Sequence, residues 1–72
     1  METKQERFKR LGESRVNKII KQVELLGNLA NTNAYEYTDE QVRSIYKTIR
    51  RALKNSESNF DKVLSASKKI VL

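Results

Sequence analysis

Residues 42 to 64 carry two stripes of side chains at helical spacing, and this pattern constrains the fold more than any other feature of the chain. Apolar residues recur every three or four positions, which places them on one side of a helix. The members of this apolar stripe are Val42, Ile45, Tyr46, Ile49, Leu53, Phe60 and Leu64. A basic stripe lies roughly opposite, with Glu40 as its only acidic neighbour on that side. Its members are Arg43, Lys47, Arg50, Arg51 and Lys54. The segment therefore predicts an amphipathic helix with one side for packing and one side open to solvent or to a partner.

The length of 72 residues predicts a single helical domain, residues 1–72. A chain of this size buries only about 60% of the surface that it exposes when unfolded. It has no cysteine for a disulfide and no cysteine or histidine for a structural zinc site. Close helix packing or self-association is the remaining way to stabilise such a chain.

The net charge is +6, from fifteen Lys and Arg against nine Asp and Glu. Such a charge favours an anionic partner: nucleic acid, an acidic protein or an anionic membrane surface. The amino terminus has no apolar core of a signal peptide, and no run approaches the roughly 20 apolar residues of a membrane span. These features predict a cytoplasmic protein that does not enter a membrane.

The first helix is predicted over residues 4 to 26. Thr3 and Glu6 have the spacing of a capping box, and Gly27 is expected to end the helix in a left-handed conformation. One face is apolar: Phe8, Val16, Ile19, Val23 and Leu26. Gly12 falls on the same face and costs the helix about 1 kcal/mol relative to alanine. We expect a continuous helix, straight or kinked, and a close approach of another backbone at Gly12 is the alternative.

Residues 27 to 38 contain three asparagines and two tyrosines, and they predict a packed loop that folds back over the ends of the helices. The next helix is predicted to begin at Asp39. Thr38 and Gln41 form a second capping box, and Tyr37 is placed to pack against Val42. Asp39 and Glu40 complement the positive end of the helix.

The end of this second helix has two interpretations. The polar segment 55–59 is able to stop it, with Ser58 capping a short third helix. Phe60 and Leu64, however, keep the helical phase of Leu53, which favours one helix over about residues 39 to 67. A frayed tail is expected after it.

Together these elements predict an all-α fold, an antiparallel hairpin of two long helices. Pairing the two helices leaves the outer edges of both apolar faces open to water. A short third helix is one way to cover them. A second copy of the chain is the other, and we favour this dimeric bundle.

The central part of the chain carries three short motifs in a row. They are Arg15-Val16-Asn17-Lys18, Leu25-Leu26-Gly27-Asn28-Leu29-Ala30-Asn31 and Tyr35-Glu36-Tyr37-Thr38. This arrangement resembles a recurrent pattern in small, uncharacterised helical bacterial proteins of plasmids and other mobile elements. The resemblance implies that the turn and the helix cap belong to a reusable scaffold, and it transfers no functional residues.

The basic stripe is the candidate functional site. From Arg43 to Lys54 it extends about 16 Å along the helix, which suits the phosphates of a nucleic acid. A solvated face that keeps the protein soluble is the alternative. The first helix adds Arg7, Arg10, Lys18 and Lys21, but Glu6, Glu13 and Glu24 flank them, as on an ordinary mixed surface.

The sequence predicts no enzyme. Its serines have no histidine to activate them, its carboxylates do not converge as metal ligands do, and it has no phosphate-binding glycine loop. We therefore expect no cofactor, no metal and no small-molecule substrate. The connection between the helices is too long for a helix-turn-helix, so base-specific readout is not predicted.

The leading hypothesis is a nucleic-acid-binding accessory protein that contacts phosphates. A protein-interaction or oligomerisation module is the rival, and a membrane-surface helix is disfavoured by the lack of tryptophan. Three tyrosines, Tyr35, Tyr37 and Tyr46, are able to stack on bases, but a packing role suits them better.

Overall fold

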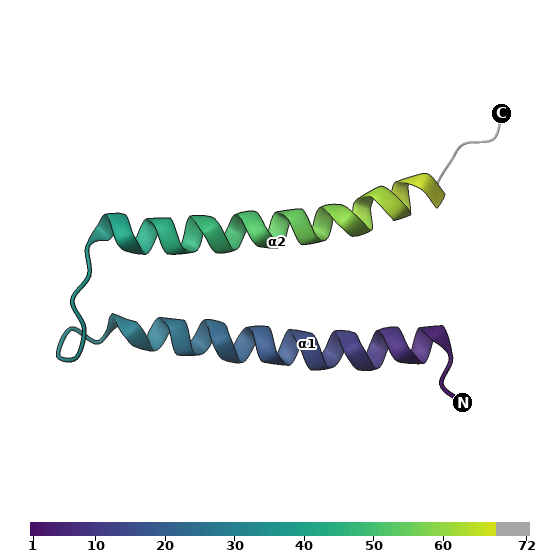
Figure 1. The fold of residues 1–72 in the computed structure, drawn as a ribbon, viewed down its shortest axis with the longest axis horizontal. Helices are drawn as coiled ribbons and strands as arrows, with labels where there is room; N and C mark the ends of the chain where they lie inside the picture. Colours follow the sequence, from purple (N-terminus) through teal and green to yellow (C-terminus); the bar gives the residue numbers. More distant parts are fainter. Residues whose placement is uncertain (68–72) are drawn as a thin grey trace. The chain divides into compact units, whose positions relative to one another are not determined.

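The computed structural model describes residues 1–67. Its elements are the helix α1 (Lys4–Gly27), a short 3-10 helix η1 (Asn28–Ala30) and the helix α2 (Asp39–Ser67) (Figure 1). The described residues contain no strand, so the all-α class is confirmed. The tail that we expected to fray lies outside the described residues.

The chain divides between Glu36 and Tyr37 into two compact units, each built around one long helix. The first unit holds α1, η1 and the turn that follows. The second begins at Tyr37 and holds α2. The antiparallel pairing of the helices, the single domain and the dimer therefore stay predictions.

The start of α1 has the predicted capping box. The Thr3 hydroxyl accepts a hydrogen bond from the Glu6 backbone N–H at 3.1 Å, and the Glu6 carboxylate accepts one from the Thr3 N–H at 3.3 Å. The helix then continues through Gly12 without interruption. A Cβ built on Gly12 meets nothing within 4 Å. The alternative, a close approach of another backbone at Gly12, stays a prediction.

The end of α1 differs from the prediction. Gly27 is the last residue of the helix and has right-handed angles, φ −61° and ψ −29°, so the predicted left-handed conformation is wrong. The backbone N–H of Asn28 instead points at the carbonyls of the last turn, and the chain tightens into η1. A 3-10 turn satisfies the terminal carbonyls of a helix without a left-handed residue, which explains the difference.

Asn31 organises the turn after η1. Its side-chain oxygen accepts a hydrogen bond from the Asn33 N–H at 3.0 Å. Its carbonyl accepts two more, from Ala34 at 3.2 Å and from Tyr35 at 3.0 Å. Local side-chain hydrogen bonding by asparagine, the reason for predicting turns here, is therefore observed. That the loop covers the helix ends stays a prediction.

The start of α2 is also as predicted. The Thr38 hydroxyl accepts the Gln41 N–H at 3.1 Å, and the Gln41 side chain accepts the Thr38 N–H at 2.9 Å. Tyr37, Val42 and Ile45 line one shallow hollow beside this cap, and the contact between Tyr37 and Val42 stays a prediction.

Helix α2 runs without a break through residues 55–59, so the interpretation as one continuous helix is confirmed. The alternative, a short third helix capped by Ser58, is wrong. Leu53, Phe60 and Leu64 therefore share one helical phase, which was the basis of the prediction.

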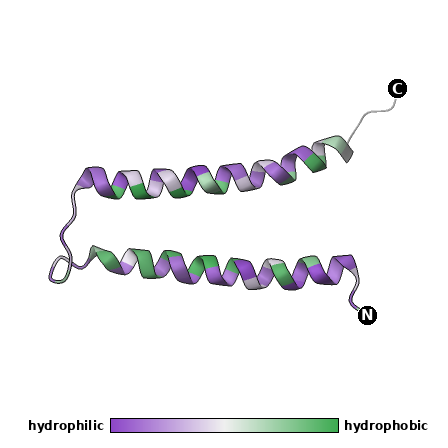
Figure 2. Ribbon diagram, in the orientation of Figure 1, coloured by the Kyte–Doolittle hydropathy of each residue, from purple (hydrophilic) through white to green (hydrophobic). Residues whose placement is uncertain are grey.

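Apolar and polar residues separate onto different sides of α2 (Figure 2). None of the described residues is buried, however. Val42, Tyr46 and Ile49 are half-buried, whereas Leu53 and Phe60 are exposed by 55% and 54%. The described residues thus form two amphipathic helices whose apolar faces remain largely accessible.

Candidate nucleic-acid interface

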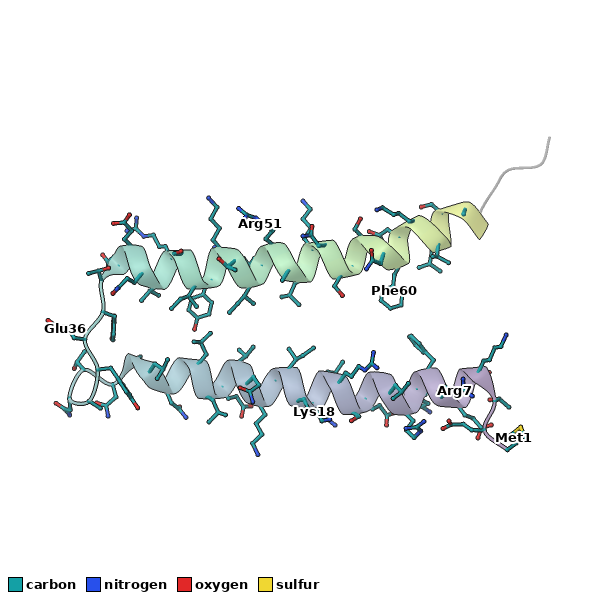
Figure 3. The ribbon with its side chains drawn as sticks, in the orientation of Figure 1. Met1, Arg7, Lys18, Glu36, Arg51 and Phe60 are labelled. Carbon is teal, nitrogen blue, oxygen red and sulfur yellow. The ribbon has the colours of Figure 1, made fainter. Side chains whose placement is uncertain are left out.

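Helix α2 brings all five members of the basic stripe onto one exposed side. Arg43 and Lys54 are eleven residues apart, which corresponds to about 16 Å along the axis. Arg51 and Phe60 point to opposite sides of α2 in Figure 3, one from the basic stripe and the other from the apolar stripe. The side chains of the basic stripe are all exposed to solvent. The two stripes therefore separate as the sequence predicted.

The acidic neighbour of the basic stripe is not the residue that we expected. Asp39, rather than Glu40, meets it: its Oδ2 lies 3.9 Å from Nη2 of Arg43. The two side chains are exposed by 95% and 82%, so solvent screens this loose pair and it contributes little. Their spacing of four residues is the ordinary one for a helical ion pair, and it is the signal that could have identified Asp39.

The other four members, Lys47, Arg50, Arg51 and Lys54, have no carboxylate within ion-pair distance among residues 1–67. The sequence explains this. No acidic residue occurs between Glu40 and Glu57, so the acidic residues of α2 lie before and after the basic stripe. Four unneutralised cations thus occupy the centre of one helix face.

Two basic residues of the first unit, Arg7 and Arg10, lie beside a carboxylate. Glu2 accepts two hydrogen bonds from the guanidinium of Arg10, at 2.7 Å from Nε and 3.0 Å from Nη2. Its carboxylate also lies 3.8 Å from Nε of Arg7. The hydrogen bonds from Arg10 lower the pKa of Glu2 below its ordinary value, and Glu2 raises the pKa of Arg10 in return. Sequence reasoning did not find this pair, because Glu2 precedes the helix.

The rest of the outer face of α1 is mixed, as predicted. A shallow depression near its amino-terminal end is lined by residues of both charges: Glu6, Lys9, Arg10, Glu13, Ser14 and Asn17. Lys18 and Lys21 are exposed, and neither has an ion pair within the described chain. Two separated lysines give a weaker field than five cations in twelve residues.

Aromatic rings lie outside the basic stripe. Tyr46 is half-buried beside the apolar stripe, and Tyr35 and Tyr37 belong to the connection. Phe60 lines a shallow hollow together with Arg50 and Lys54. Glu57 lines the same hollow and adds a carboxylate to it.

Among residues 1–67, no group of three or more carboxylate, histidine or cysteine side chains is placed to hold a metal ion. Neither described helix is both long enough and apolar enough to cross a membrane. Comparison with protein-family models, with curated proteins and with solved structures found no match for this chain.

Proposed function

We propose that this chain is a non-enzymatic nucleic-acid-binding accessory protein of the cytoplasm, which uses the basic stripe of α2 to contact phosphates. One observation carries the proposal. Lys47, Arg50, Arg51 and Lys54 share an exposed helix face with no carboxylate in ion-pair distance within residues 1–67. On an ordinary solvated face, oppositely charged neighbours at three or four residues offset one another.

Phosphates are the anions that this surface suits. A row of cations about 16 Å long extends past several phosphates, since a duplex carries one negative charge per roughly 1.7 Å of its axis. Lysine and arginine bind phosphate without reading bases, and release of condensed counterions supplies much of the affinity. The net charge of +6 draws the protein to such a partner from a distance.

The proposal includes assembly. In this proposal, the apolar stripe of α2 packs against the apolar face of α1 as an antiparallel hairpin, and two hairpins form a homodimeric bundle. The exposed apolar residues support this step, because Leu53, Phe60 and Val63 are each more than half exposed. A dimer carries two basic stripes.

The test is a binding titration with a fluorescent 20-base-pair DNA at about 50 mM salt, repeated with R50Q/R51Q. We expect the double variant to bind roughly tenfold more weakly, since each exposed ion pair contributes up to about 1 kcal/mol. K18Q/K21Q is the matched control, because it removes the same charge from α1. Absence of binding by the native chain, or equal losses in the two variants, would refute the proposal.

A protein-interaction or oligomerisation module is the second candidate. The observation that favours it is the same exposure of the apolar residues, in a chain without a buried described residue. It predicts stable association without affinity for nucleic acid. Sedimentation of the native chain, together with the titration above, distinguishes the two candidates.

A further inference from the structure

The angular spread of the basic stripe limits the kind of nucleic acid that fits it. Consecutive helical residues are turned by about 100°, so Arg50 and Arg51 point in directions about 100° apart. Lys47 and Lys54 lie at angles between them on the neighbouring turns. The stripe thus has two diverging edges and a centre, and all of its members are exposed.

A groove with phosphates on both walls matches this arrangement. The major groove of B-form DNA is about 12 Å wide, and a helix with its side chains is about 10–12 Å across. With α2 lying along the groove, Arg50 faces one phosphate backbone while Arg51 faces the other. The major groove of an RNA duplex is deep and narrow, so a helix does not enter it in this way.

A single strand is a poorer partner for this surface. Single-strand binding sites combine cations with aromatic rings on which bases stack. The basic stripe contains no aromatic residue, and Tyr46 is half-buried on the other side of its edge. The hollow that leads to Phe60 also contains the Glu57 carboxylate, which repels a phosphate strand entering it.

We infer that α2 binds double-stranded DNA in the major groove, with Arg50 and Arg51 on opposite backbones and without base-specific contacts. This inference rests on the proposed function and specifies its substrate class. The stripe ends at acidic residues on both sides, Asp39 and Glu40 before it and Glu57 after it. Each copy of α2 therefore contacts about five phosphates at most, one per cation.

The experiment compares three probes of one sequence and length: duplex DNA, duplex RNA and single-stranded DNA. We expect duplex DNA to bind at least tenfold more tightly than either of the others at about 100 mM salt. The slope of log K against log salt should be no steeper than about −4.5 for one α2, and no steeper than about −9 when both stripes of a dimer contact the DNA. Unlabelled duplexes of unrelated sequence should compete equally.

Three variants sharpen the result. R50K/R51K keeps both charges and should retain the preference for duplex DNA, whereas R50Q/R51Q should lower the slope magnitude by about 2 for each stripe in contact. F60L keeps an apolar side chain but removes the ring, and we expect it to bind as the native chain does. Circular dichroism of each variant checks that the helices remain.

The outcomes separate the inference from the proposed function. Equal or tighter binding of single-stranded DNA or duplex RNA overturns the inference while nucleic-acid binding itself stands. A selective loss of single-strand binding in F60L would show that stacking dominates, and it would overturn the inference too. Failure of all three probes removes the proposed function as well.

Discussion

Glu2 and Arg10 are joined by a bidentate contact that crosses the start of α1, with oxygen–nitrogen distances of 2.7 and 3.0 Å. The carboxylate precedes the capping residue Thr3, and the guanidinium comes from the second turn of the helix. The two side chains lie at the surface, so the contact pairs the charge of Arg10 but adds nothing to a hydrophobic core. The basic stripe of α2 has no such contact at Lys47, Arg50, Arg51 or Lys54 within residues 1–67.

This pair predicts a measurable titration. Because Arg10 lowers the pKa of Glu2, the contact is present above the ordinary value of 4.5 and is lost as the pH falls through the lowered value. The side-chain carbon of Glu2, followed by NMR, should titrate with a midpoint below 4.5. In R10Q the midpoint should return toward the ordinary value. An unchanged midpoint in R10Q would show that the pair does not form in solution.

The cap of α2 predicts a stability change with a matched control. T38A removes the hydroxyl that accepts the Gln41 N–H, and we expect it to lower the free energy of unfolding by about 1 kcal/mol. Thr48 lies inside the helix, where its hydroxyl donates to the Ser44 carbonyl. T48A should raise the free energy of unfolding by about 0.5 kcal/mol, because alanine is the better helix former. Urea unfolding followed by circular dichroism measures both. Equal effects would contradict the cap.

Gly12 provides a test of whether another backbone packs against α1. A Cβ at this position meets nothing within 4 Å, so G12A should raise the free energy of unfolding by about 1 kcal/mol. Destabilisation would mean that another backbone packs against Gly12 in the assembled protein. Thermal unfolding at several protein concentrations distinguishes a contact within one chain from a contact between copies.

The apolar stripe predicts the state of association. L53D places a charge on the exposed apolar side of α2, and we expect it to reduce the sedimenting species from dimer to monomer. N55D adds the same charge away from the apolar stripe and should leave the dimer intact. A native chain that sediments as a monomer would exclude the assembly step of the proposal.

The caps and the helical phases were predictable because they depend on neighbours within four residues. Thr38 and Gln41 show this, and the continuity of α2 followed from the spacing of Leu53 and Phe60. Gly27 was predicted wrongly because glycine fits both a left-handed cap and a 3-10 continuation, and the hydrogen bonds of Asn28 select the second. The three- and four-residue spacings of helical neighbours do not link Glu2 to Arg10, because Glu2 precedes the helix.

In the candidate site, the helical periodicity of the sequence was enough to predict which residues form the basic stripe. Its acidic neighbour was missed, although Asp39 has the four-residue spacing from Arg43 that is ordinary for a helical ion pair. Pairing of the helices depends on contacts between residues far apart in the sequence. Local periodicity identifies the faces that are available for such contacts, but it does not specify their partners.

The lack of any buried side chain in the described residues has a consequence for the abundance of the native form. In the proposed dimer, the exposed apolar faces become an interior only when two chains meet, so the folded fraction rises with protein concentration. Dilution should then lower the melting temperature, and bound nucleic acid should raise it.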